Sequence, residues 1–238
     1  MMDYITWIID PAVRKHCGPL LFANSMDVPK GNILNNGTFA LVNTGRKRLL
    51  VTCCHVWDQF KQLQTEHPDL KFCVCASLKQ PWALHKIDSM WVDDDRKCDL
   101  VTFDIGCLES ECAACGLNFF NIQENPPPKL SEGDTIYLIG FPGKGREDNE
   151  DSVGFPRQAI AVNATQVGQF SFLADLSKRK METSFFAGIS GAPCFACSAN
   201  RPIKLVGFAT GFAPNSLGML QFTYASFIQP DGIIRYMS

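Results

Sequence analysis

Ser190 and its neighbours form the stretch of the sequence with the clearest potential for chemistry. The segment GISGAP, residues 188–193, places a hydroxyl between two glycines, and glycine permits backbone conformations that a Cβ excludes. Such a turn can direct backbone N–H groups, here those of Gly188 and Ser190, at an oxygen atom that gains negative charge during acyl transfer. The alternative is an ordinary Gly-Ser turn, so the segment predicts a nucleophile only if a base can reach it.

His55 is the best candidate for that base among the four histidines. A serine hydroxyl is a poor nucleophile at neutral pH and needs a general base. His55 follows the strand-like run RLLVTCC and opens a predicted helix, so a rigid element holds it, as a precise base requires. We expect His16 and His67 to be surface residues and His85 to be structural.

Asp99 is the best candidate for the carboxylate that orients the imidazole and stabilises its protonated form. It stands at the start of the β-run DLVTFDI. The run Asp93–Asp95 has the pattern of solvated charge, and Asp104 lies further along the same strand, where its side chain reaches another face or depth. His55, Asp99 and Ser190 together predict nucleophilic acyl transfer.

The elements that must position these residues are mostly short strands. Apolar β-rich runs are separated by Gly, Pro, Asn and Asp, which is typical of an antiparallel barrel or sandwich. The runs are GTFALV, RLLVTCCHV, KFCVCASL, DLVTFDI, DTIYLIGF, AIAVNATQV, FSFLADL, IKLVGFATGF and MLQFTYASF. Helix is predicted only at residues 4–16, 55–67 and 229–237.

Three consecutive prolines, Pro126–Pro128, mark the predicted domain boundary, because they form a stiff connector without backbone donors. Residues 1–125 would hold an N-terminal segment and a first β-domain with His55 and Asp99. Residues 126–238 would hold a second β-domain with the Ser190 loop and the C-terminal tail.

The motifs resemble those of the trypsin-like (chymotrypsin-fold) serine peptidases, especially their bacterial-type, disulfide-free branch. LLVTCCHV is similar to the strand that ends in the base of that family, DLVTFDI to the strand that carries its acid, and GISGAPCF to its nucleophile loop. GDTIYLIGFPG is similar to the opening of the second barrel of the family, and LVGFATGF to the strand beside its specificity pocket. The resemblance spans about residues 37–229 in the order His, Asp, Ser.

The resemblance implies an all-β fold of two six-stranded antiparallel β-barrels with short helices and a site between the barrels. It implies that His55 takes the proton of Ser190, that Asp99 orients His55, and that Gly188 and Ser190 provide the oxyanion hole. It also implies that no metal or organic cofactor is required.

Substrate contacts follow from the same resemblance. Ser184 would lie at the floor of the primary pocket, and Phe208, Ala209, Thr210 and Gly211 would form its wall and pair with an extended substrate. With no carboxylate at the floor, we expect an uncharged, apolar or small residue before the cleaved bond.

Two positions depart from the secreted members of the family. Val56 stands where they usually carry a cysteine directly after the histidine, and Ile189 stands where many have an aspartate before the nucleophile. Activation by an ion pair between that aspartate and a newly cut N-terminus is therefore excluded, and we expect regulation to come from a partner protein, a loop or substrate supply.

Composition bounds the partners and the compartment. The 238 residues carry a formal net charge of −2, which gives no electrostatic reason for nucleic-acid binding. The sequence contains no run of the about 18 apolar residues that are needed to cross a membrane. The N-terminus also lacks the pattern of a secretory signal. We therefore expect a cytoplasmic protein.

The eleven cysteines are an odd number in a chain long enough to need no disulfides. We expect free thiols, with Cys53 and Cys54 packed as small residues. An alternative is a structural zinc site built from the pairs Cys112/Cys115 and Cys194/Cys197, which have the local spacing of zinc ligands.

The sequence thus predicts an intracellular serine endopeptidase that acts on protein or peptide substrates. The alternatives are a catalytically silent or latent peptidase-fold module that binds extended peptides or a protein partner, and an interaction protein with a metal-bound cysteine cluster.

Overall fold

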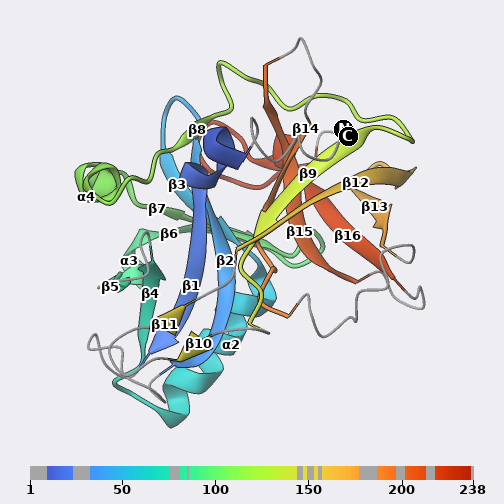
Figure 1. Ribbon diagram of the computed structural model, residues 1–238. Coiled ribbons are helices and arrows are strands. Elements are labelled where there is room, and N and C mark those ends of the chain that lie inside the picture. The colour runs from blue at the N-terminus through green and yellow to red at the C-terminus, as the bar shows by residue number, and fades with distance from the viewer. Residues whose placement is uncertain are drawn as a thin grey trace.

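β-strands dominate the structure, a computed structural model that describes residues 10–23, 33–75, 81–84, 86–143, 147–148, 153–154, 157–176, 187–196, 202–212 and 218–236. The strands form two bodies that pack side by side (Figure 1). The first contains β1 (Cys17–Ala23), β2 (Ile33–Asn43), β3 (Arg48–Thr52), β4 (Lys71–Cys75), β5 (Pro81–Ala83), β6 (Trp91–Asp95), β7 (Leu100–Asp104) and β8 (Phe120–Asn121). The second contains β9 (Thr135–Gly140), β12 (Gln158–Val167), β13 (Ser171–Asp175), β14 (Pro193–Ala196), β15 (Lys204–Phe212) and β16 (Met219–Tyr224).

The second body is a closed antiparallel barrel of six strands in the order β12-β13-β16-β15-β14-β9, which confirms that part of the predicted fold. The strands β10 (Glu147–Asp148) and β11 (Val153–Gly154) form a separate antiparallel pair. The boundary predicted after residue 125 falls between β8 and β9 and stays a prediction.

The first body differs from the predicted six-stranded barrel. It is a curled sheet of eight strands in the order β5-β4-β1-β2-β3-β7-β6, with β8 parallel to β2. Within the described residues, β5 and β6 do not pair with each other to close it. Both are poor edges for further pairing, because β5 has only three residues and β6 carries three aspartates.

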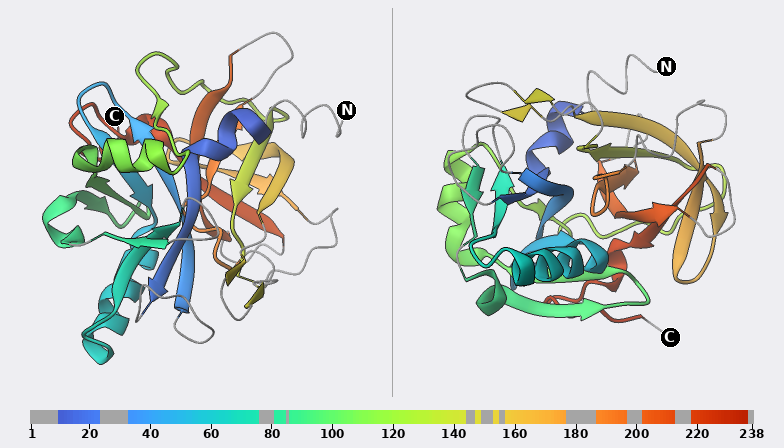
Figure 2. Two further views of the ribbon diagram at one scale, coloured as in Figure 1. Left: turned by 60° about the vertical axis from the view of Figure 1, so that its left-hand side comes forward. Right: turned by 90° about the horizontal axis from the view of Figure 1, so that it is seen from below.

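Three hydrophobic clusters explain why so many strands are buried on both faces. One fills the curled sheet and one fills the barrel, while the third lies between the two bodies. Successive residues of β1 show the alternation, since Leu20 and Phe22 point into the curled sheet whereas Leu21 and Ala23 join the shared cluster. The shared cluster fixes the two bodies against each other, and Figure 2 shows the two bodies from two further sides.

The helix α2 (Cys54–Glu66) follows β3 directly and confirms the helix predicted at 55–67. Its buried residues Trp57 and Phe60 join an aromatic cluster with Phe22, Phe72 and Phe103, with ring centroids 5.0 to 5.6 Å apart for the pairs that involve Trp57 or Phe60. Aromatic packing of this kind contributes both buried area and preferred ring geometry. The start of α2 is therefore anchored to the core.

The remaining helices are short: α3 (Ile87–Met90), α4 (Glu109–Ala114) and the 3-10 turns η1 (Arg14–His16), η2 (Gly106–Leu108) and η5 (Ala225–Phe227). In the described part of the chain, no helix is long and apolar enough to span a membrane. Of the helix predicted at 4–16, residues 4–9 lie outside the described residues, and residues 10–16 are helical as predicted and end in η1.

The helix predicted at 229–237 is wrong for the residues that the structure describes. Ile228 pairs with Ile234 across a turn instead. Gly232 has φ +84°, and the Asp231 side chain accepts a hydrogen bond from the N–H of Ile233, so the local chemistry favours a turn.

Candidate active site

His55 is the second residue of α2, and its neighbours hold it in place. Cys54, Val56 and Trp57 are buried in the core of the curled sheet, whereas the His55 side chain is 49% exposed. The ring therefore stands at the surface on a backbone that the core fixes. The structure confirms the predicted strand-to-helix junction at this position.

Asp99 ends the turn that connects β6 to β7. Its φ of +53° lies in the left-handed region, which Asp tolerates better than most other residues. The Asp95 carboxylate accepts hydrogen bonds from the N–H groups of Lys97 and Cys98, at 2.8 and 3.0 Å. The Thr223 hydroxyl of the barrel donates to the carbonyl of Cys98 at 2.7 Å. Both bodies thus hold the turn that carries Asp99.

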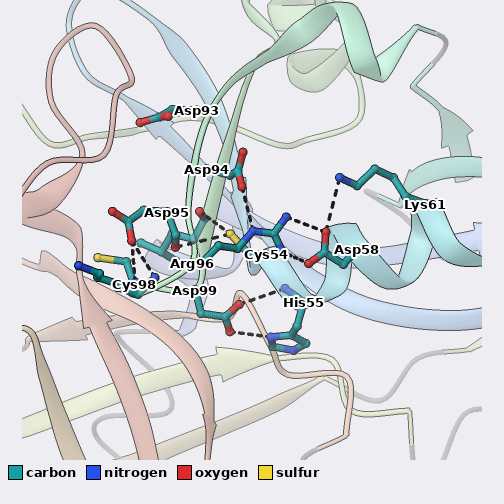
Figure 3. Close-up of polar contacts among 12 residues, drawn as sticks. Cys54, His55, Asp58, Lys61, Asp93, Asp94, Asp95, Arg96, Cys98 and Asp99 are labelled. Atoms are coloured by element: carbon teal, nitrogen blue, oxygen red, sulfur yellow. Dashed lines mark hydrogen bonds and ion pairs between the residues drawn. The ribbon is translucent and has the colours of Figure 1, made fainter.

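Two hydrogen bonds join His55 to Asp99 (Figure 3). Asp99 Oδ1 accepts from the backbone N–H of His55 at 3.0 Å, and Asp99 Oδ2 lies 2.6 Å from His55 Nδ1. An ionised carboxylate can only accept, so a neutral ring bonded to one through Nδ1 would carry its proton there and present a lone pair at Nε2. This is the tautomer that a base needs in order to take a proton at Nε2.

The guanidinium of Arg96 connects the acidic turn to α2, as Figure 3 shows. It pairs with Asp94 at 3.1 Å and with Asp58 of the helix, which also pairs with Lys61 at 3.5 Å. These groups are partly exposed, and exposed ion pairs contribute little energy each. Their effect here is to link the two elements that carry Asp99 and His55.

The prediction that Asp93–Asp95 form a solvated run is wrong for Asp93 and Asp95. All three residues are only partly exposed, and the C-terminal tail contacts the first and the last of them. Asp93 accepts a hydrogen bond from the N–H of Ile234 at 2.8 Å, and Asp95 accepts one from the Tyr236 hydroxyl at 2.9 Å. The carboxylates are therefore structural acceptors.

Ser190 completes the arrangement from the barrel. Its Oγ lies 2.8 Å from His55 Nε2. Gly188 and Gly191 on either side have φ values of +95° and +88°, and a Cβ on Gly191 would lie 2.2 Å from the carbonyl oxygen of Thr38. Both glycines are required by the turn, and the structure joins Asp99, His55 and Ser190 in one continuous hydrogen-bonded chain.

The predicted oxyanion donors, the N–H groups of Gly188 and Ser190, donate to no acceptor among the described residues. The carbonyls on the opposite side of the turn are all used, since Gly188 O accepts from Thr38 Oγ1, Ser190 O from Thr38 N, and Ile189 O from Ala192 N. The turn therefore directs its acceptors into the protein and leaves these two donors available to a ligand oxygen.

The predicted substrate-contact residues have different surroundings. Phe208 and Ala209 are fully buried, and both backbone groups of Ala209 are already bonded to Gly191 and Ala192. Thr210 is 9% exposed, and a Cβ on Gly211 would have no heavy atom within 4 Å. Of the four, only Thr210 and Gly211 are not fully buried, and the substrate role of all four residues stays a prediction. Ser184 lies outside the described residues.

The other histidines lie away from this chain of contacts. His67 is exposed, as predicted, and His85 lies outside the described residues. The surface prediction for His16 is wrong, because its ring is buried, lies 2.7 Å from the carbonyl of Asn118 and packs edge-on against Phe120. Burial lowers the pKa of His16 to about 4, so the ring is neutral at pH 7.

Free thiols are found at Cys17, Cys53, Cys54, Cys98, Cys107, Cys112, Cys115 and Cys194. Cys112 lies in the core of the curled sheet and Cys194 in the core of the barrel, so the alternative of one zinc site shared by their two Cys-x-x-Cys pairs is wrong for these residues; Cys197 lies outside the described part. In the described ranges, potential metal ligands come together only at Cys53, His55 and Asp99. There the Nδ1 of His55 and the carboxylate of Asp99 are already bonded to each other.

The thiols beside His55 are expected to be inert. Burial is the main cause that raises the pKa of Cys54 to about 12 and the pKa of Cys53 well above its usual value, so the reactive thiolate is negligible at pH 8. Iodoacetamide at pH 8 should modify the exposed Cys107 and Cys115 and leave Cys53 and Cys54 intact until the protein is unfolded. Peptide mass mapping checks this, and alkylation of Cys54 as fast as Cys107 would contradict it.

Sequence analysis missed two threonines that support the site. Thr223 holds the turn before Asp99, and Thr38 of β2 contacts the Ser190 turn. Thr38 follows a glycine at the start of a β-run, which signals only a strand. Its partner Gly188 is 150 residues away in sequence, so no local pattern could reveal the contact.

No protein-family model and no curated protein sequence matches the chain. Among solved structures, it is similar to the serine endoprotease from Yersinia pestis, with a TM-score of 0.58, 14% identity, and coverage of 91% of this chain and 61% of that chain. It is also similar to a thermostable serine protease from an extremophilic microorganism, with a TM-score of 0.54, 12% identity, and coverage of 90% and 93%.

A third similar structure comes from work on the coupled folding and binding of the intrinsically disordered Sesbania mosaic virus VPg protein. Its TM-score is 0.51 at 12% identity, and the match covers 89% of this chain and 87% of that chain. Identities this low are informative about the fold alone. The chain therefore shares the chymotrypsin-like fold found in serine proteases.

Proposed function

We propose that this protein is a serine endopeptidase that hydrolyses peptide bonds through an acyl-enzyme. The observation that carries the proposal is the hydrogen-bonded chain from Asp99 through His55 to Ser190, with contacts of 2.6 and 2.8 Å. A nucleophile within reach of a base, and a base oriented by a third group, is the arrangement that covalent acyl transfer needs. The fold supports the proposal by analogy only.

In the proposed first step, Ser190 Oγ attacks the scissile carbonyl carbon while its proton moves to His55 Nε2. Asp99 stabilises the resulting imidazolium through Nδ1 without taking its proton. The carbonyl oxygen, now negatively charged, accepts hydrogen bonds from the N–H groups of Gly188 and Ser190. The C–N bond then breaks, and His55 returns the proton to the leaving amine.

Water completes the proposed cycle. His55 Nε2 takes a proton from a water molecule as the water oxygen attacks the ester carbon of the acyl-enzyme. The bond to Ser190 Oγ breaks, the proton returns to that oxygen, and the carboxylic acid product leaves. Each step uses the same base and the same pair of backbone donors.

A peptide substrate can be added as a strand along β15. The strand β14 pairs with β15 as far as Phe208, and no described strand pairs with the backbone of Thr210 or Gly211 on the edge of β15 that faces away from β16. The backbone at Thr210 and Gly211 is available there for main-chain pairing. By the resemblance, Ser184 would lie at the pocket floor, and on that ground we propose a preference for an uncharged residue before the cut.

The test is a fluorophosphonate probe, in which Ser190 Oγ would displace fluoride and form a stable bond to phosphorus. We expect one adduct on the intact protein, located at Ser190 by peptide mapping, and no adduct on His55→Ala. A folded wild-type protein that forms no adduct would contradict the proposal and favour a peptide-binding module without turnover.

A further inference from the structure

Thr38 belongs to the curled sheet, and its N–H, hydroxyl and carbonyl all form hydrogen bonds at or beside the Ser190 turn. It is fully buried in β2. Its N–H donates to Ser190 O at 3.0 Å, and its hydroxyl donates to Gly188 O at 2.9 Å and accepts from the N–H of Phe141 at 3.1 Å. Its own carbonyl accepts from the Thr52 hydroxyl at 2.9 Å.

These contacts belong to a set that fixes every carbonyl of the turn. Ala187 O accepts from Gly143 N at 2.7 Å, and Ile189 O accepts from Ala192 N at 2.8 Å. Thr38 holds the two carbonyls that remain, those of Gly188 and Ser190. Because N–H and C=O point in opposite directions across a trans peptide, four anchored carbonyls determine where the N–H groups of residues 188–191 point.

The Thr38 hydroxyl has a second effect through Phe141. The hydrogen bond from Phe141 N ties Thr38 to the segment Phe141–Gly143, and Gly143 N holds the carbonyl of Ala187. That carbonyl belongs to the peptide whose N–H is the Gly188 donor. The Thr38 hydroxyl therefore acts on both peptides of Gly188. It donates to the Gly188 carbonyl, and it accepts from the segment Phe141–Gly143, which holds the peptide of the Gly188 N–H.

Gly188 needs this support because it lacks a Cβ that would restrict its torsions. From these contacts we infer that Thr38 is a positioning residue for the oxyanion donors, acting through its hydroxyl on the Gly188 peptides. The inference rests on the proposed function, since it assigns Thr38 to the same site. Valine has the shape of threonine but can neither donate to Gly188 O nor accept from Phe141 N.

The experiment compares fluorophosphonate labelling rates of Thr38→Val, Thr38→Ser and wild-type protein. Losing one oxyanion donor outright costs about 100- to 1,000-fold, so loss of its support should slow Thr38→Val by about tenfold or more. Thr38→Ser retains the hydroxyl and should stay within about threefold of wild type. On a cleavable peptide, Thr38→Val should lower kcat and leave KM within about twofold.

Thr102→Val is the matched control, because Thr102 is equally buried and its hydroxyl donates to the carbonyl of Gly232, away from the turn. It should lose stability but label at the wild-type rate. If Thr38→Val does not fold, the labelling rates of Thr38→Ser and Thr38→Ala are compared instead, because serine keeps the hydroxyl and alanine lacks it. Equal labelling of Thr38→Val and wild type, or equal slowing of the Ser and Val variants, would overturn the inference.

A structural readout separates this inference from the proposed function. The ¹⁵N–¹H resonances of Gly188 and Ser190 should shift in Thr38→Val and stay in place in Thr102→Val. Unchanged resonances in Thr38→Val overturn the positioning role even if wild-type protein labels well. If the resonances shift in Thr38→Val but wild-type protein never labels, the shift supports the positioning role. The missing label then overturns the peptidase proposal alone.

Discussion

Replacing Ser190 with alanine is expected to lower kcat/KM for a cleavable peptide by about ten-thousand-fold or more. The hydroxyl lies 2.8 Å from His55 Nε2, and alanine removes the only atom that could form the acyl bond. The backbone N–H groups of the turn remain, so a small rate above that in water should persist. Cleavage of a peptide library, followed by mass spectrometry, measures the loss.

The control for Ser190→Ala is Ser89→Ala on α3, where the hydroxyl is exposed and, among the described residues, bonds to the carbonyl of Lys86 alone. It should cleave the library like wild type. Cleavage by Ser190→Ala at a rate near that of wild type would exclude an acyl-enzyme on this residue. The same library reports the residue before the cut, and a profile dominated by Arg or Lys would exclude the proposed uncharged preference.

Replacing Asp99 with asparagine is expected to slow fluorophosphonate labelling and peptide cleavage by about ten-thousand-fold. The Asn amide can accept from the backbone N–H of His55 at the position of Oδ1, which then places its NH₂ group opposite His55 Nδ1. A donor there favours the tautomer with the proton on Nε2, which cannot take the proton of Ser190. Asparagine also tolerates the left-handed φ of +53°, so the backbone should keep its conformation.

Asp104→Asn makes the same chemical change at the other end of β7. Asp104 pairs with Lys47 at 2.8 Å and does not contact His55 or Ser190, so its variant should react within about twofold of wild type. Thermal unfolding of both variants confirms that they fold. A folded Asp99→Asn protein that labels at the wild-type rate would show that Asp99 does not orient the base.

The sequence predicted the residues of the site because each lies in a short local pattern. His55 follows a β-run and opens a helix, Asp99 begins another β-run, and Ser190 lies between glycines, so strand propensity and turn chemistry identify each one separately. Their order along the chain then matches one known arrangement. The six strands of the closed barrel include five predicted β-runs, which local apolar patterning explains; only β14 was not singled out.

Elements without such a pattern were missed or misread. The strand β6 reads WVDDD, and its aspartates suggested solvent because the donors that bind Asp93 and Asp95 belong to Ile234 and Tyr236, each 141 residues away. A helix is predicted for the tail at residues 229–237, but Asp231 and Gly232 make a turn there. His16 looked exposed because its partners, Asn118 and Phe120, lie beyond the reach of local sequence.

By itself, then, the sequence determined the β-rich architecture and the three residues that could perform acyl transfer, since propensity and turn chemistry act over a few residues. Only the tertiary structure decided that His55 and Ser190, 135 residues apart, come within 2.8 Å, and that the first sheet curls without closing among the described residues. It also decided that Thr38 holds the turn beside Ser190. Hydrogen bonds between distant segments depend on how the hydrophobic clusters pack the two bodies together, and no local pattern encodes that packing.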